Sequence, residues 1–268
     1  MKIVVIGSSG RIGRRLVKAL RQEDCRVLEA SPTHGVDAVT GTGLAQAMVD
    51  AEIVVDVSNS PALNGAAALR FFDTASRNLL SAGRAAGVRH HIALSIVGVD
   101  RLVSNDYFRA KKRQEDLVKA SGIPFAILRS TQFFEFISDV VQEGTARDIA
   151  ISPALAQPVA AEDVANMLAD MVLSIPSNAT LEIAGPEQFR LDQVATEIAT
   201  AYEDGRRIVA DIHARYFGAE LEESSLLPGP DARIAPLRFD DWLRESLSPD
   251  WSSVPATRKL VRAREANL

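Results

Sequence analysis

The stretch Lys2-Ile3-Val4-Val5-Ile6-Gly7-Ser8-Ser9-Gly10-Arg11-Ile12-Gly13 decides the fold of this chain. The apolar run at 3–6 predicts a buried strand. Glycines follow it with the spacing G-x-x-G-x-x-G, and apolar side chains then recur at helical spacing over 12–21. A strand, a glycine turn and a helix in that order predict the first unit of a layered sheet-and-helix fold.

Working outward, strand-like and helix-like runs alternate through the first half of the chain. The expected strands lie at 25–30, 36–39, 53–57, 91–96 and 125–128, and the expected helices at 43–49, 66–83 and 107–120. Strands that alternate with helices are typical of parallel strands joined by right-handed crossovers. The sequence therefore predicts an α/β fold with a doubly wound parallel sheet, the Rossmann fold.

Past residue 150 the alternation becomes less regular. We expect helices at 162–173, 191–202 and 239–247, strands at 179–184 and 207–212, a loop at 220–236 and a peripheral helix at 259–268. We find neither an internal repeat nor a linker long enough to separate independent domains. We therefore expect a core at 1–150 and a small C-terminal lobe at 151–268, packed together as one structural unit.

Composition excludes several classes of function. The chain has 268 residues, 47% hydrophobic and 24% charged, with a net charge of −5. A nucleic-acid or anionic-membrane surface calls for a basic excess, so neither partner is expected. Four histidines and one cysteine predict neither a metal site nor an internal disulfide, which suits the cytoplasm. The N-terminal apolar run is too short for a signal peptide or a membrane span.

The glycine turn points to a dinucleotide. Its glycines permit a tight turn, close approach of a pyrophosphate and close packing of helix on strand. The N-terminus of the following helix offers free N–H groups to phosphate oxygens. We therefore predict an NAD(P)-binding core whose turn contacts the cofactor through Gly7, Ser9, Gly10, Arg11, Ile12 and Gly13. The alternative is a purely structural turn.

The end of the second strand bears on the choice between NAD(H) and NADP(H). A carboxylate there would bind the ribose 2′-hydroxyl of NAD and repel a 2′-phosphate. The position falls on Ser31, and Glu29 should point elsewhere if the strand ends at Ala30. Arg11 can offer a cation on the adenine side, so we expect NADP(H) to be preferred over NAD(H). The alternative is that Arg11 is solvated and Ser31 tolerates both cofactors.

Two further regions come after expected strands. Val57, Ser58 and Asn59 follow the strand at 53–57, and backbone at such an edge faces the ligand in open α/β sheets. We predict that these three residues line the cofactor path, with an ordinary turn as the equally weighted alternative. Phe133, Phe134 and Phe136 are predicted as core residues, ahead of a role as an apolar pocket wall. His90 and His91 are predicted to be solvated loop residues.

Ser95, Tyr107 and Lys111 form a candidate catalytic set. The tyrosine and the lysine are four residues apart on one expected helix face. A nearby ammonium would lower the pKa of the phenol, and the same lysine can hold the nicotinamide ribose. Ser95 ends a strand-like run and would orient the substrate oxygen. Each of these residues alone could have a purely structural role. Their occurrence together, in this order and after a dinucleotide-binding turn, is poorly explained by chance.

With these motifs the chain resembles the short-chain dehydrogenase/reductase superfamily, in its atypical NmrA-like or NAD(P)H-binding branch. The resemblance rests on motifs at 7–13, 57–60, 94–98, 107–111, 128–134, 158–165 and 181–186. It implies a Rossmann core, NADP(H) binding and Ser95, Tyr107 and Lys111 as the catalytic set. It also implies that the segment 129–132, with Ser130, passes the nicotinamide. Asn78 is the candidate for the superfamily's fourth catalytic residue, an asparagine.

The resemblance favours an NADP(H)-dependent oxidoreductase of the atypical short-chain type. Its substrate would be a small carbonyl or quinone-like molecule held against the C-terminal lobe. The alternative is a redox sensor that binds NADP(H) without turnover. Such sensors often lack the tyrosine, so the presence of Tyr107 favours an enzyme. A homodimer is compatible with the sequence, and nothing in it decides the question.

Overall fold

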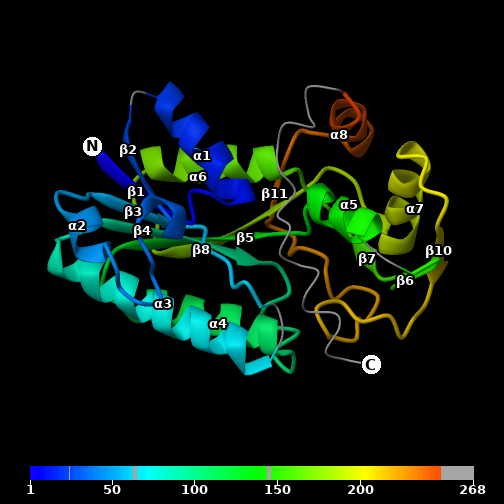
Figure 1. Ribbon diagram of the computed structural model, residues 1–268, viewed down its shortest axis with the longest axis horizontal. Coiled ribbons are helices and arrows are strands. Elements are labelled where there is room, and N and C mark those ends of the chain that lie inside the picture. The colour runs from blue at the N-terminus through cyan, green and yellow to red at the C-terminus, as the bar shows by residue number, and fades with distance from the viewer. Residues whose placement is uncertain (24, 63–64, 144–145, 249–268) are drawn as a thin grey trace.

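A parallel sheet of seven strands forms the central layer of the computed structural model, which describes residues 1–23, 25–62, 65–143 and 146–248. The strand order is β11-β8-β5-β4-β3-β1-β2, which confirms the predicted doubly wound α/β fold (Figure 1). The strands are β1 (Lys2–Ile6), β2 (Arg26–Ala30), β3 (Ile53–Asp56), β4 (His90–Ile96), β5 (Phe125–Ser130), β8 (Ala179–Ala184) and β11 (Arg233–Ile234). Because all of them are parallel, their carboxyl ends meet at one edge of the sheet.

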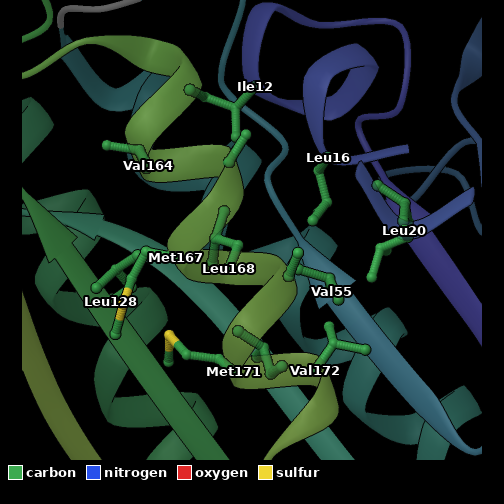
Figure 2. Packing of buried hydrophobic residues seen from close by; sticks show 14 of the residues in the cluster. Ile12, Leu16, Leu20, Val55, Leu128, Val164, Met167, Leu168, Met171 and Val172 are labelled. Carbon is green, nitrogen blue, oxygen red and sulfur yellow. The ribbon is translucent and has the colours of Figure 1, made fainter. Parts of the chain in front are cut away.

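Helices cover both faces of this sheet. Helices α1 (Arg11–Gln22) and α6 (Ala161–Leu173) lie on one face, and α2 (Leu44–Met48), α3 (Gly65–Ala85) and α4 (Asp106–Lys119) lie on the other (Figure 1). Successive side chains of a strand point to opposite faces of the sheet. Val55 therefore packs against α1 and α6, whereas Val54 packs against α3. Figure 2 shows side chains of α1 and α6 gathered over Val55 and Leu128. Burial on both faces explains why these strands read as continuous apolar runs.

The remaining elements lie to one side of the sheet. They are α5 (Phe134–Glu143), α7 (Leu191–Ala201), α8 (Phe239–Ser246) and two small sheets (Figure 1). One small sheet pairs β6 (Asp148–Ile151) with β10 (Arg207–Ala210), and the other pairs β7 (Leu155–Ala156) with β9 (Phe189–Arg190). Their core is aromatic, with Trp242 stacked on Phe134 at 5.1 Å between ring centroids. Phe134 is thus a core residue, as predicted.

Three local features of the structure differ from the prediction. The residues at 36–39 form no strand, because Asp37 Oδ1 accepts from the backbone N–H of Val39 and holds a turn. Helix α5 was not predicted, since its phenylalanines obscured the helical spacing. The loop expected at 220–236 contains β11, which pairs with β8 at the sheet edge. The helix expected at 259–268 lies outside the described residues.

His90 and His91 are buried at the start of β4, so the prediction of solvated loop residues was wrong. Burial lowers the pKa of His90 to about 4, and His91 beside it adds to the effect. Burial also lowers the pKa of His91, while Asp56 opposes the change. Both imidazoles are therefore neutral structural groups at the edge of the sheet away from the glycine turn.

The described residues contain neither a membrane-spanning helix nor a cluster of metal ligands. None of the helices there combines the length and apolar character that crossing a bilayer requires. Within the same residues, no three His, Cys, Asp or Glu side chains are grouped as metal ligands.

Candidate active site

The glycine turn lies between β1 and α1, at the carboxyl edge of the sheet. Gly7 has a φ of +81°, and a Cβ placed on it would lie 2.8 Å from the backbone of Ser58. A Cβ on Gly13 would lie 2.2 Å from the carbonyl oxygen of Gly7. Both positions therefore require glycine for steric reasons. The N-cap of α1 is Gly10, which supplies no side-chain cap, so the helix N-terminus can offer its N–H groups to an anion.

Arg11, the first residue of α1, is engaged by a distant carboxylate. Its Nη2 donates to Asp139 Oδ2 of α5 at 2.6 Å, and both side chains are largely buried. Burial raises the pKa of Asp139, although Arg11 opposes the rise. The ion pair thus joins the glycine turn to α5, the helix that follows β5. A phosphate contact by Arg11 would have to share or replace Asp139.

The end of β2 is arranged as expected. The strand stops at Ala30, and Glu29 accepts a hydrogen bond from Arg21 at 2.6 Å. Ser31 is buried, and its Oγ lies 2.8 Å from Thr33 Oγ1 and 2.7 Å from His34 Nδ1. The strand therefore ends in hydroxyl and imidazole groups rather than in a free carboxylate.

The loop after β3 lies against the glycine turn. Asp56 ends the strand and accepts hydrogen bonds from the backbone N–H of Ser58 at 3.0 Å and from Ser58 Oγ at 2.6 Å. The close approach of Gly7 to Ser58 places this loop against the proposed cofactor turn. Val57, Ser58 and Asn59 thus occupy the edge at which we expected them.

Tyr107 lies in the first turn of α4. Asn105 caps this helix through its Oδ1, which accepts from Tyr107 N at 2.9 Å and Phe108 N at 3.3 Å. The side chain of Tyr107 is buried, with 7% exposed, and its Oη donates to Asn59 Oδ1 at 3.1 Å. Burial raises the pKa of Tyr107. The structure thus shows a neutral phenol, and the expected lowering of its pKa by Lys111 is not seen.

An aromatic residue from the C-terminal part covers Tyr107. The ring of Phe217 stacks on it at 4.8 Å between centroids and 19° between planes. Phe217 has a φ of +51° and precedes Gly218 in a tight turn closed by two hydrogen bonds between Tyr216 and Ala219. Asn105 Nδ2 donates to the Phe217 carbonyl oxygen at 2.7 Å, so the residue that caps α4 also holds this turn.

Lys111 lies one helical turn further along α4 and is 5% exposed. Its Nζ donates to the Leu94 carbonyl at 2.7 Å and to Gln114 Oε1, and lies 4.5 Å from the centroid of the Phe72 ring. Burial lowers the pKa of Lys111 to about 8, while Asp56 and Glu115 oppose the shift. Among the described residues no hydrogen bond joins Lys111 to Tyr107. The ammonium is thus directed into the protein.

Ser95 is also buried, near the end of β4. Its Oγ makes no hydrogen bond of full geometry within the described part of the chain, but it lies near the Glu115 carboxylate of α4. Burial raises the pKa of Glu115, whereas Arg129 and then Ser95 hold that pKa below its usual range. Ser130 ends β5 in register with Ile96, so Ser95 and Ser130 both lie near the carboxyl edge. Tyr107 and Asn59 touch directly, whereas Ser95 is separate from them.

One predicted residue lies outside this site, and two others were missed. Asn78 donates to the carbonyl oxygens of Ala38 and Val39, both at 2.9 Å, so it belongs to the loop that follows β2 and not to Tyr107. Gln114 was missed, although it follows Lys111 by three residues on the same helix face. Phe217 was missed because its contact with Tyr107 spans over a hundred residues of sequence, which no local pattern reports.

Comparisons with known proteins find a matching family model, related sequences and similar folds. A family model described as NAD(P)H-binding matches residues 7–174. A divinyl chlorophyllide a 8-vinyl-reductase from Cucumis sativus is 27% identical over 69% of this chain and 52% of its own length. A (4-alkanoyl-5-oxo-2,5-dihydrofuran-3-yl)methyl phosphate reductase from Streptomyces griseus is 27% identical over 49% of this chain and 48% of its own length.

The chain therefore spans about half the length of these curated relatives. Among solved structures, an NADPH-dependent quinone oxidoreductase from Escherichia coli superposes with a TM-score of 0.65. It is 14% identical, and the match covers 92% of this chain and all of that one. At this identity the likeness supports the fold.

Proposed function

The chain belongs to the NAD(P)H-binding family, and we propose that it is an NADP(H)-dependent oxidoreductase acting on a small carbonyl or quinone-like substrate. One observation carries the proposal. The neutral, buried Tyr107 hydroxyl contacts the loop that packs on Gly7 of the glycine turn. A proton donor and a dinucleotide turn thus share one edge of the sheet, where open α/β sheets bind their ligands.

The chemistry is a two-electron reduction. The hydride for the substrate carbon would come from bound NADPH, which would leave as NADP⁺. As the C=O π bond breaks, the substrate oxygen takes the Tyr107 proton, and the phenol regains a proton from solvent. Ser95 orients the substrate oxygen in this proposal. Lys111 reaches the nicotinamide ribose only if its ammonium leaves Gln114.

The expected preference for NADP(H) rests on the end of β2. Glu29 is occupied by Arg21, so it does not offer its carboxylate to a ribose 2′-hydroxyl. The hydroxyls of Ser31 and Thr33 are suited to a 2′-phosphate. Gly7, Ser9, Gly10, Arg11, Ile12 and Gly13 would hold the pyrophosphate, with Val57 to Asn59 and Ser130 beside the ribose and nicotinamide. NADPH is expected to bind more tightly than NADH in a calorimetric titration.

The names of the similar proteins support the substrate class. The two curated relatives are reductases, and the Escherichia coli structure is a quinone oxidoreductase that uses NADPH. The ring of Phe217 stacks on Tyr107 at 4.8 Å, and the ring of Phe136 stacks on Phe217 at 5.0 Å. Such a surface is suited to a flat, apolar substrate.

A second candidate function is a redox sensor that binds NADP(H) without turnover. It is favoured by the separation of Ser95 from Tyr107 and by the inward direction of Lys111. The catalytic set is not assembled in this conformation. A sensor needs only the glycine turn and the ends of β2 and β3.

The Tyr107→Phe variant tests the proposal. Turnover of NADPH with a panel of quinones and carbonyls should fall by about 100-fold or more, because the proton donor is removed. The dissociation constant for NADPH should be unchanged. Tyr202→Phe is the matched control, because that hydroxyl lies 3.1 Å from Ser246 Oγ in the C-terminal lobe.

Two outcomes would contradict the proposal. Full turnover in Tyr107→Phe removes the tyrosine from the catalytic step. If NADPH binds tightly to the wild-type protein but no member of the panel oxidises it, the sensor is the better description.

A further inference from the structure

We infer that Asn59 is a positioning residue that sets the orientation of the Tyr107 hydroxyl. It would take the place of Asn78, the asparagine that the sequence suggested for the catalytic set. The inference rests on the proposed function for its chemistry, but its geometry stands alone. The phenol of Tyr107 makes its hydrogen bond to Asn59 Oδ1, across 48 residues of sequence. Asn78, the residue expected in such a role, binds the loop after β2.

The orientation of the Asn59 amide follows from a second contact. Its Oδ1 also accepts from the backbone N–H of Ser60 at 3.0 Å. If the amide were turned over, an NH₂ group would face that N–H, which is unfavourable. Oδ1 therefore faces Tyr107 as an acceptor, and the phenol must act as the donor.

The loop that carries Asn59 is itself anchored to α4. Asp56 Oδ2 accepts from Gln114 Nε2 at 2.8 Å in a buried bond, and Gln114 Oε1 accepts from Lys111. The other carboxylate oxygen of Asp56 holds Ser58. Helix α4 and the loop are thus linked twice, once through Gln114 and Asp56 and once through Tyr107 and Asn59.

The ring of Tyr107 is confined by its neighbours. Phe217 stacks on one face, and Phe72 approaches with its ring plane at 74° and its centroid at 6.1 Å. These contacts limit the ring but do not direct the hydroxyl hydrogen. Asn59 supplies that direction. Because Ser58 of the same loop packs on Gly7, the loop connects the glycine turn to the proton donor.

The test observes Tyr107 directly, in protein without substrate. The chain has three tyrosines, so labelling with [¹³Cζ]tyrosine yields three resonances, which Tyr202→Phe and Tyr216→Phe assign. Asn59→Leu removes the acceptor at similar size, and Asn59→Asp keeps an acceptor oxygen. The Tyr107 resonance should move upfield in Asn59→Leu and stay near its wild-type position in Asn59→Asp. Asn78→Leu, the matched loss of an amide, should leave it in place.

A kinetic measurement then reports on the chemistry. With NADPH and 2-methyl-1,4-naphthoquinone as the probe, kcat should fall about 10- to 100-fold in Asn59→Leu. Asn59→Asp should restore kcat, and the dissociation constant for NADPH, measured in parallel, separates a loss of proton donation from a loss of cofactor binding by Asn59. Asn59→Ala replaces Asn59→Leu if circular dichroism shows that the leucine variant does not fold.

The outcomes separate this inference from the proposed function. A Tyr107 resonance that does not move in Asn59→Leu, or that moves equally in Asn78→Leu, overturns the inference. If the resonance moves as expected but no quinone is reduced by the wild-type protein, Asn59 still positions the phenol and the proposed turnover is wrong.

Discussion

The glycine turn and the first turns of α4 lie at the same edge of the sheet but are determined in different ways. The turn depends on backbone contacts between residues that are close in sequence. Neighbouring backbone atoms leave no room for a Cβ at Gly7 or at Gly13. The α4 region depends on side chains from distant segments, since Tyr107 meets Asn59 and Phe217, and Lys111 meets Leu94. Local backbone geometry can be read from a motif, whereas the partners of Tyr107 and Lys111 cannot.

The largest effect is expected at the turn. Gly13→Ala should abolish detectable NADPH binding and lower the free energy of unfolding by about 3 kcal/mol, because its Cβ would lie 2.2 Å from the Gly7 carbonyl oxygen. Calorimetric titration and urea unfolding measure the two quantities. Gly205→Ala is the control, because no atom lies within 4 Å of the added Cβ. Normal NADPH binding by Gly13→Ala would show that the turn does not need its glycines.

The same contrast explains what the sequence predicted. The strand-to-helix unit around Gly7 was predicted correctly, because apolar periodicity and glycine spacing are local signals. The end of β2 at Ala30 was also correct. Glu29, which was expected to point elsewhere, pairs with Arg21 and also lies 3.6 Å from His34 near that strand end.

The α4 region was predicted only in part. The sequence indicated that Tyr107 and Lys111 share a helix face, and both lie on the buried face of α4. It could not show that Lys111 bonds to Leu94, because this partner becomes available only when α4 packs on β4. The bond to Gln114 lies within α4 and was a local signal that was missed. Asn78 was proposed by position along the chain, and its true partners lie in a loop that was itself expected to be a strand.

A smaller effect, on stability alone, is expected at the opposite end of β4. His90 lies there with 3% of its surface exposed, and its ring nitrogens have no hydrogen-bond partner among the described residues. Its pKa is about 4 in the folded protein and near 6.5 when unfolded, so the unfolded chain binds the proton first. Stability should therefore fall as the pH drops from about 6.5 to 4, by up to about 3 kcal/mol. Urea unfolding across this range measures the loss.

His90→Leu should remove most of that pH dependence, since the apolar side chain has no proton to gain. His213→Leu is the control, because His213 is exposed. An unchanged pH profile in His90→Leu would assign the acid sensitivity to other groups, such as His91, whose pKa is also lowered by burial.

The smallest effect is expected where the two regions differ least, at Arg11, a residue of the turn that a distant side chain holds. Asp139→Asn should cost less than about 1 kcal/mol of stability. The two side chains of the ion pair keep 20% and 16% of their surface exposed, and burial disfavours the charged form of Asp139. It should also strengthen NADPH binding by a few-fold, since the freed guanidinium can turn toward a phosphate. Weaker binding would instead mean that Asp139 holds Arg11 in the orientation the cofactor needs, and that the turn, like α4, depends on a partner far along the chain.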